Sequence, residues 1–382
     1  MQSVAADASA STEKAVASIR VLWPKTLNGG AQSGLCVQLQ ALIGYAIAAR
    51  GLNCTLVLPN FTSHISMGTD VRFEELFEAE PIVRALRSIG ISSLLESALS
   101  SVQLSGPPMI PKSKLGGFHQ YKTFKARQRK LHGRQSQQLV GEQVEDALIR
   151  SLTGSAAMLH RVEHVKASLG LHGSNATYGC MHPRIEADMM MGAWTIVGVG
   201  QPPRLSDYLD GMSRFDELRQ VSRFYVAVGS AISRKDNATL ARHEEAKSPW
   251  PRLVRSHEPK PFHNRRNFSD PSLYIAASLT DFLVCRDASV FIGWSGSAFA
   301  TLVAHSAKLR NKHARWYSAC PGQMERLDRW SIGLKTAFAC NTAETRNCTA
   351  AHGCYRFGTS EAVVQSSRDM SRSGWDGGPT SG

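Results

Sequence analysis

One N-terminal segment constrains the fold more than any other part of the sequence. Ile19–Trp23 is a short apolar run typical of a strand, and a glycine-rich turn at 29–34 follows it. Apolar residues then recur at helical spacing from Leu39 onward, and Gly51 is a natural helix stop. Thr55–Leu58 is a second strand-like run. This order of strand, turn, helix and strand predicts a βαβ unit and therefore a parallel α/β sheet.

A second series of strand and helix patterns begins near residue 172. The predicted strands are Thr177–His182, Trp194–Gly198, Arg223–Val228, Asp281–Cys285 and Ser289–Trp294. A helix is expected over Pro271–Thr280, and another begins at about Ser297. Two α/β halves with a cleft between them are therefore the predicted architecture.

Length and composition fit this prediction. The chain has 382 residues, of which 42% are hydrophobic and 20% charged, which excludes wholesale disorder and leaves room for two domains. No apolar run approaches the ~18 residues that cross a bilayer, so we expect no membrane-spanning segment. The predicted parts are a disordered N-terminus (1–17), an N-terminal α/β domain (18–170), a C-terminal α/β domain (171–340) and a cysteine-containing segment with a flexible tail (341–382).

The net charge of +13 is unevenly distributed along the chain. Residues 112–134, inside the helix-prone region 64–165, hold eight basic residues and no acidic one. A basic surface can bind nucleic acid, a membrane surface or acidic ligands, but a local cluster is more often a solvated loop. No zinc-finger spacing, aromatic-basic pattern or repeat accompanies it. We therefore expect no nucleic-acid partner, with nucleic-acid binding as the alternative.

The eight cysteines fall into two groups. Four lie in apolar segments, where a free thiol behaves as a small hydrophobic side chain: Cys36, Cys54, Cys180 and Cys285. The other four lie in a polar C-terminal stretch: Cys320, Cys340, Cys348 and Cys354. The spacing of this second group fits no zinc module, so we expect two disulfides there, with the pairing open.

Glycosylation sequons are unusually frequent. Six of the ten asparagines begin an Asn-x-Ser/Thr sequon: Asn53, Asn60, Asn175, Asn237, Asn267 and Asn347. Roughly two would be expected by chance, so the excess indicates a glycosylating compartment. The N-terminus has no apolar signal core. We expect a protein of the secretory pathway (the lumen of the endoplasmic reticulum or Golgi) whose signal or anchor is absent from this sequence; the alternative is a cytosolic protein.

Three segments are candidates for ligand binding. The first is the glycine turn, where glycines allow close backbone approach and the following helix N-terminus favours anions. The second is Arg184, which follows a strand end, where a planar guanidinium suits a phosphate. The third is the stretch 293–297, where Ser295 or Ser297 would begin a helix. Each has a simpler interpretation: a tight turn, a surface ion pair and a helix cap.

Taken together, the three segments predict a nucleotide-diphosphate site in a two-domain α/β chain. The sequence contains no Asp-x-Asp motif to carry a metal ion. This favours a design without metal or other cofactor, in which arginine and backbone amides neutralise a leaving diphosphate.

Five motifs occur in an order that carries a family resemblance. They are GLCVQL at 34–39, NCTLVLP at 53–59, HPRIEADM at 182–189, FYVAVG at 224–229 and the segment from Asp281 to Phe299. This ordered set resembles the GDP-fucose protein O-fucosyltransferase family, especially its plant-type and algal-type branches. The motifs spread over about residues 19–310, which is most of the chain.

The resemblance implies a GT-B fold, with two Rossmann-like domains that face each other across a cleft. The N-terminal domain would lie on the acceptor side, and the C-terminal domain would bind GDP-fucose. It further implies an inverting reaction without metal, in which fucose passes to a hydroxyl of a secreted protein or glycan. The implied donor-binding residues are Gly30, Gly34, His182, Arg184, Asp281, Ser295, Ser297, Ala298 and Phe299. Arg184 would also be catalytic, because it would assist the departure of GDP.

The sequence departs from the family pattern at several points. Val37 and Trp294 each replace an asparagine, and Ala298 replaces a serine. No acidic residue lies between 29 and 39, so Glu186 is the candidate general base, with Asp188 as a further choice. Two alternatives follow: a catalytically impaired protein that binds a nucleotide sugar or a glycan, and a fucosyltransferase that acts on carbohydrate.

Overall fold

The computed structural model describes most of the chain, and the statements below concern these residues alone. The described ranges are 19–24, 34–62, 70–109, 121, 140–171, 177–185, 203–229, 232–245, 251–255, 272–294, 297–310, 315–320 and 323–327. They divide into two compact units. The first unit extends to Glu163 and includes α11 up to Thr280, and the second begins at His164 and includes Asp281 and the residues after it.

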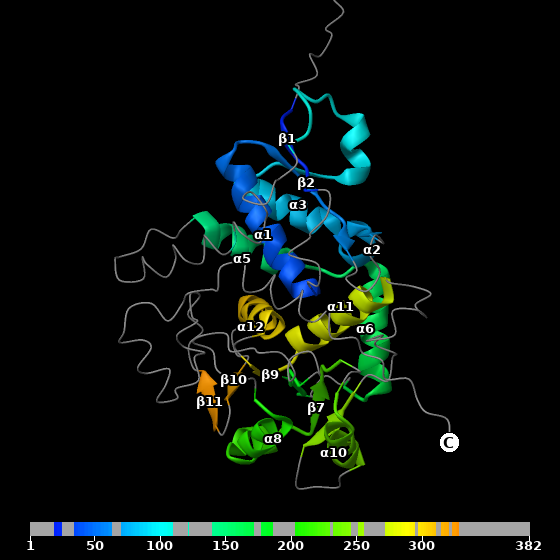
Figure 1. Cartoon of the computed structure of the whole chain (residues 1–382), viewed down its shortest axis with the longest axis vertical. Coiled ribbons are helices and arrows are strands. Elements are labelled where there is room, and N and C mark those ends of the chain that lie inside the picture. Colours follow the sequence, from blue (N-terminus) through cyan, green and yellow to red (C-terminus); the bar gives the residue numbers. More distant parts are fainter. Residues whose placement is uncertain are drawn as a thin grey trace, which may run out of the picture. The chain divides into compact units, whose positions relative to one another are not determined.

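The first unit contains the βαβ pattern that the sequence predicts. Strands β1 (Val21–Leu22), β2 (Thr55–Leu58) and β5 (Ser93–Leu95) form a parallel sheet in the order β1-β2-β5. Helix α1 (Leu35–Gly51) connects β1 to β2 and packs on β2 (Figure 1). The remaining elements are β3 (Phe61–Thr62), β4 (Asp70–Val71), α2 (Phe73–Leu76), α3 (Ala79–Ser88), η1 (Glu96–Ser101), α5 (Val140–Ser151) and α6 (Ala156–Ser168), the last of which continues into the second unit.

A buried glutamine fixes α1 against β3. Gln38 is 1% exposed. Its Nε2 donates to the Thr62 carbonyl at 2.8 Å, and its Oε1 accepts from the Thr62 N–H at 2.9 Å. Both polar atoms of the buried amide are thereby satisfied, so the side chain replaces part of a strand ladder.

The second unit is built on a six-stranded sheet. Its order is β11-β10-β9-β6-β7-β8, and all neighbours are parallel except β10 and β11. The strands are β6 (Gly179–His182), β7 (Arg223–Val226), β8 (Arg252–Val254), β9 (Val290–Gly293), β10 (Arg315–Cys320) and β11 (Gln323–Leu327). The helices are α8 (Leu205–Ser213), α9 (Asp216–Arg219), α10 (Arg234–Glu245), α12 (Ala298–Arg310) and, from Asp281 onward, the end of α11 (Ser272–Arg286). An α/β fold with parallel sheets is therefore confirmed.

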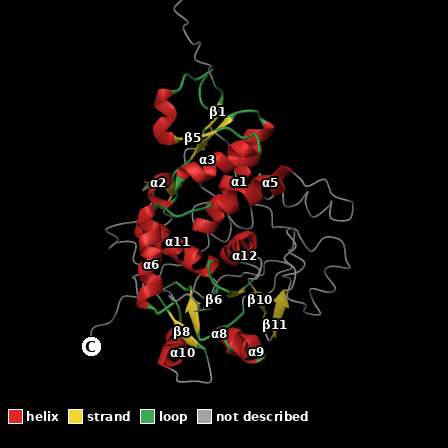
Figure 2. Ribbon diagram, turned by 180° about the vertical axis from the view of Figure 1, so that it is seen from behind, coloured by secondary structure: helices red, strands yellow, loops and turns green. Residues whose placement is uncertain are grey.

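Side chains along the central strands alternate between the two faces of this sheet. Met181, Val226 and Ile292 belong to one apolar cluster with residues of α8, α9 and α10. Cys180 and Tyr225 point to the opposite face, where they contact α11. Both cartoon views show α11 and α12 on one side of the sheet and α8 and α10 on the other (Figures 1 and 2).

The strand order identifies a switch point between β6 and β9. After β6 the chain moves through α8 to β7 and β8 on one side, whereas after β9 it moves through α12 to β10 on the other. Open α/β sheets bind their ligands at such a point, beside the carboxyl ends of the strands.

One predicted strand is wrong. Residues 281–285 belong to the helix α11 rather than to a strand. Four consecutive side chains, from Phe282 to Cys285, have no solvent exposure. A helix turn that is buried all round is continuously apolar, and this pattern is the same as that of a buried strand.

The prediction of four free apolar thiols is also wrong in part. Cys180 and Cys285 form a disulfide, whereas Cys36 and Cys54 are free. Cys36 is buried, and burial raises the pKa of its thiol because the charged thiolate would lose its hydration.

Several predictions fall on residues outside the described ranges. They concern the N-terminus (1–17), the strand at 194–198, all of the basic stretch 112–134 except Tyr121, the pairing of the C-terminal cysteines, and the tail. The predicted domains also stay a prediction. No helix in the described ranges is long and apolar enough to cross a membrane.

Candidate functional site

The structure brings six of the predicted site residues into the second unit and places one in the first. Gly34 lies directly before α1 in the first unit. Gly30, Glu186 and Ser295 lie outside the described ranges. The six that share the second unit are His182, Arg184, Asp281, Ser297, Ala298 and Phe299.

These residues gather around the switch point. His182 is the last residue of β6, and it pairs in register with Gly293, the last residue of β9. Arg184 follows β6 by two residues, and Ser297 directly precedes α12. The sequence therefore brings residues from two separate motifs to the carboxyl ends of two adjacent parallel strands.

His182 is held in place by a neighbouring strand and by α12. Its side chain is 7% exposed, and Nδ1 lies 2.8 Å from the carbonyl oxygen of Ala227, directly after β7. Because a carbonyl can only accept, Nδ1 is the donor. The imidazole also packs on Phe299, with the ring centroids 4.3 Å apart and the rings inclined by 45°. These contacts fix the ring between β7 and α12.

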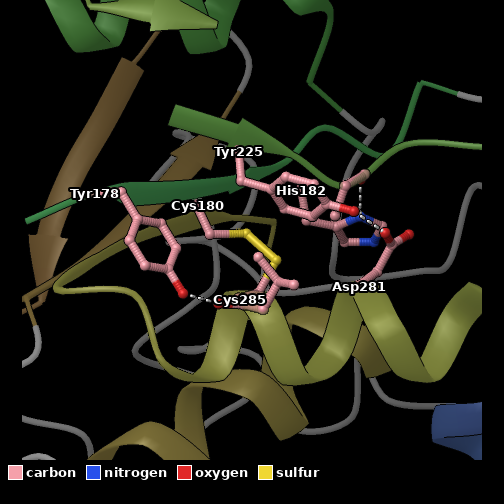
Figure 3. The surroundings of a disulfide bond; sticks show 8 residues. Tyr178, Cys180, His182, Tyr225, Asp281 and Cys285 are labelled. Carbon is pink, nitrogen blue, oxygen red and sulfur yellow. Dashed lines mark hydrogen bonds between the residues drawn. A yellow bond between two sulfur atoms is a disulfide. The ribbon is translucent and has the colours of Figure 1, made fainter. Parts of the chain in front are cut away.

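Asp281 belongs to α11, which packs on the sheet near the same strand ends. Asp281 is 7% exposed, and its Oδ1 accepts a hydrogen bond from the Tyr225 hydroxyl (Figure 3). Tyr225 is completely buried. Figure 3 shows the Asp281 carboxylate on the same face of the sheet as the His182 ring. A strand residue thus determines where this carboxylate lies.

Two further links join β6 and its preceding residues to α11 beneath this pair (Figure 3). The disulfide connects Cys180, two residues before His182, to Cys285, one helical turn after Asp281; the two Cα atoms are 5.1 Å apart. The hydroxyl of Tyr178 donates to the carbonyl of Val284 at 2.8 Å. The position of α11 along β6 is therefore fixed by a covalent bond and by a buried hydrogen bond.

Ser297 caps helix α12. The Ala300 N–H donates to its Oγ at 3.4 Å, and its carbonyl accepts from the Thr301 N–H at 3.0 Å. The simpler interpretation of this serine as a helix cap is thus correct. Ala298 and Phe299 are the first residues of the helix. N–H groups at that position have no acceptor within their helix, and they favour a bound anion.

Arg184 lies just beyond the carboxyl end of β6. The residue is half-buried, and its backbone N–H donates to the hydroxyl of Tyr208 at 3.5 Å. Tyr208 belongs to α8 and is completely buried, and the neighbouring Ile185 is 2% exposed. The backbone on both sides of the arginine is therefore anchored in the core.

Trp294 does not occupy this face. Its side chain is completely buried in the apolar cluster on the α8 side of the sheet. Within the described part of the chain, its Nε1 has no hydrogen-bond partner. This tryptophan, at the position where the resemblance leads one to expect an asparagine, therefore packs in the core.

Sequence reasoning missed two features of the site. Tyr225 belongs to the recognised FYVAVG motif but was not predicted to be part of the site, and Cys180 and Cys285 were interpreted as separate thiols. Alternation along β7 is the signal that could have placed Tyr225 on the α11 face. Among the described residues, no group of three or more metal-binding side chains comes together, and independence from metal stays a prediction.

Comparison with known proteins supports the fold. No protein-family model matches the sequence, and no curated protein is significantly similar to it. The solved structure of POFUT1 in complex with GDP is 13% identical; the match covers 79% of this chain and 97% of that chain, with a TM-score of 0.50. The fucosyltransferase NodZ from Bradyrhizobium is also 13% identical, with 82% and 100% covered and a TM-score of 0.46. The likeness to POFUT1 shows a shared fold.

Proposed function

We propose that this protein is an inverting glycosyltransferase that uses GDP-fucose without a metal ion and transfers fucose to a hydroxyl of a protein or glycan. One observation carries the proposal: six of the residues that the sequence assigns to donor binding lie around the switch point between β6 and β9. The ordered motifs, and the shared fold with a protein whose structure contains GDP, support it.

The proposed chemistry is charge stabilisation of the departing GDP. The bond between the fucose anomeric carbon and the diphosphate breaks while the acceptor oxygen attacks from the opposite side, and the acceptor proton passes to a base. The Arg184 guanidinium and the first N–H groups of α12 would compensate the charge that develops on the diphosphate. Glu186 is the proposed base, and Asp281 would recognise the nucleotide.

The finer parts of the proposal rest on the family resemblance. They comprise a GT-B arrangement of two Rossmann-like domains with a cleft, and an acceptor bound from the N-terminal side near Gly30 and Gly34. A secretory location in the endoplasmic reticulum or Golgi is proposed on separate grounds, the six sequons and the cysteine usage. A specific observation favours one alternative, a catalytically impaired binding protein. The position directly after β9, where the resemblance expects an asparagine, is occupied by Trp294, whose side chain is buried in the core and so offers the donor no amide.

Calorimetric titration of GDP and GDP-fucose, with a chelator present, tests donor binding. Arg184→Ala removes a charge-assisted contact, which is worth on the order of 2–3 kcal/mol or roughly 30- to 150-fold in affinity. Arg184→Lys is the matched control, because it keeps the charge and loses the planar fork; it should fall between wild type and Arg184→Ala. If wild type binds GDP no better than ADP, the proposal is wrong.

A transfer assay then separates the enzyme from the binding protein. Wild type is incubated with GDP-fucose and candidate acceptors, and the release of GDP and the fucosylated product are both measured. Tight binding of GDP with neither product would support the catalytically impaired alternative. Release of GDP together with a fucosylated acceptor supports the proposed enzyme.

A further inference from the structure

Three of the six glycosylation sequons lie in described parts of the structure, and they differ in how they hold the asparagine. They are Asn53, Asn60 and Asn237. An N-linked sugar is bulky and must project into solvent from the amide nitrogen. The surroundings of each amide therefore decide which sequon the folded protein can carry in modified form.

Asn53 presents its side chain to solvent at the turn between α1 and β2. It is exposed, and its backbone is in the left-handed region, with φ of 49°. Its backbone N–H donates to the Arg50 carbonyl at 3.2 Å. Within the described ranges its side-chain amide has no hydrogen-bond partner. The turn is therefore held by the backbone, and the amide nitrogen can be modified without loss of a contact.

The surface around Asn53 is suited to sugar hydroxyls. Asn53 lines a shallow recess of about 170 Å³ together with polar groups that include Arg20, Arg50 and Ser92. Within the described ranges, the only side-chain hydrogen-bond partners of Arg20 and Arg50 are the Met109 sulfur at 3.9 Å and Gln143 Oε1 at 3.5 Å. Both guanidinium groups thus have N–H donors left over for hydroxyl oxygens.

Asn60 differs from Asn53 because both polar atoms of its side chain make hydrogen bonds. The residue is half-buried between Pro59 and Phe61, which are both buried. Its Nδ2 donates to Glu96 Oε2 at 3.0 Å, and its Oδ1 accepts from the Phe73 N–H at 3.3 Å. A sugar on this half-buried nitrogen would replace one of its two hydrogens and crowd Glu96 and the two buried neighbours, so the folded protein disfavours modification of Asn60.

Asn237 provides an internal comparison. It is exposed on helix α10, and its Oδ1 accepts from an Arg255 guanidinium nitrogen at 2.8 Å. Its amide nitrogen makes no hydrogen bond within the described ranges. A sugar on this nitrogen is compatible with the helix. Asn237 is therefore a second accessible sequon, with a helical backbone where Asn53 has a left-handed one.

We propose that Asn53 carries an N-linked glycan in the folded protein and that Asn60 does not. In this transfer a lipid-diphosphate-linked oligosaccharide is the donor. The bond from its first sugar carbon to the diphosphate breaks, that carbon bonds to Nδ2, and Nδ2 gives up one proton. The Cys180–Cys285 disulfide fits the oxidising compartment in which this transfer takes place.

Mass spectrometry of the protein secreted from eukaryotic cells tests the proposal. The full chain is expressed behind a secretion signal, and enzymatic deglycosylation in heavy-oxygen water converts each modified asparagine to a labelled aspartate. Both sequons lie in one tryptic peptide, Gly51–Arg72, so one spectrum compares them directly. The expected peptide carries one label, and fragmentation places it at position 53.

Variants make the result independent of peptide recovery. Asn53→Asp keeps the side-chain shape and tolerates the left-handed backbone, so it should fold normally and lose the label from this peptide. Asn237→Asp is the matched control and should leave the label at position 53 unchanged. Folded, secreted protein with an unlabelled position 53, or with a labelled position 60, overturns the proposal.

Discussion

The Tyr225 hydroxyl donates a hydrogen bond to the Asp281 carboxylate, and this bond joins the middle of β7 to helix α11. Tyr225 is completely buried, and Asp281 is 7% exposed. A carboxylate at that depth is costly unless its lone pairs have partners. The tyrosine therefore both stabilises the helix against the sheet and fixes a carboxylate that the proposed function assigns to nucleotide recognition.

Tyr225→Phe removes only this hydroxyl and keeps the buried ring. We expect it to lower the free energy of unfolding by about 1–3 kcal/mol, because a buried carboxylate loses a donor. Urea denaturation followed by circular dichroism measures the change. Tyr178→Phe, which removes a hydrogen bond to the neutral Val284 carbonyl, is the matched control and should cost less. Equal losses would show that the charge of Asp281 is unimportant to the bond.

Ser297→Ala removes the cap of α12. The expected loss is about 1 kcal/mol of stability, because the Ala300 N–H then lacks its acceptor. Ser297→Asn keeps a capping oxygen and should restore most of that loss in thermal denaturation. If the alanine and asparagine variants are equally destabilised, the side chain does not act as a cap.

Gly293→Ala should destabilise the end of β9. An added Cβ would lie 2.6 Å from the Phe291 ring and 2.8 Å from the Ala300 Cβ, so β9 and α12 would have to separate. Overpacking of this kind costs about 1–3 kcal/mol. Gly34→Ala is the control, because no atom of the described residues lies within 4 Å of its added Cβ. Chemical denaturation of both variants should show a loss for Gly293→Ala alone.

The Cys180–Cys285 disulfide should contribute strongly to stability. It closes a loop of 105 residues, for which chain entropy alone suggests about 4–5 kcal/mol, and measured values are typically about 2–4 kcal/mol. Denaturation with and without a phosphine reductant measures the difference. The Cys180→Ala/Cys285→Ala double variant should be less stable than oxidised wild type and insensitive to the reductant. A stability that the reductant leaves unchanged in wild type would contradict the link.

The lowered pKa of Asp287 makes the free energy of unfolding depend on pH. Burial raises the pKa of this carboxyl, but the neighbouring Arg286 and Lys166 outweigh burial and lower the pKa below the ordinary value of 3.8. In the folded state Asp287 thus binds a proton less readily than in the unfolded state. Its stabilising contribution is complete above pH 3.8 and is lost as the pH falls through the lowered value.

Asp287→Asn should therefore be less stable than wild type at neutral pH, because Lys166 loses its ion pair at 2.9 Å. The difference between the two proteins should shrink as the pH is lowered below 3.8. Urea midpoints measured across a pH series test this, and comparison with the variant cancels the other carboxylates. A difference that is constant with pH would assign the effect to packing rather than to charge.

The sequence predicts the three central strands of the second unit, β6, β7 and β9, because these runs are short, apolar and followed by clear turn signals. It does not predict β8, β10 or β11. The ends of β6 and β9 are placed correctly to within one residue, and this is why the residues around His182 and Ser297 can be located in advance. Their meeting follows from sheet topology, because the carboxyl ends of neighbouring parallel strands lie at one edge. The local sequence pattern does not reveal the order of the strands in the sheet.

Two parts of the site depend on long-range packing and therefore escape local pattern analysis. Residues 282–285 are apolar and buried on all sides because sheet and helices surround them, so their helical period is hidden. Cys180 and Cys285 pair only because β6 and α11 lie against each other, and cysteines 105 residues apart show no such relation in the sequence.

The disulfide also changes what a cut in the chain would do. Strands β7 and β8 and helices α8, α9 and α10 all lie between Cys180 and Cys285, so this whole stretch is a closed covalent ring. A protease that cleaves once within the ring opens it without releasing a fragment. The nicked protein keeps its intact mass plus one water, and on a gel its two pieces separate only after reduction. A single nick can therefore leave the two halves of the site attached to each other.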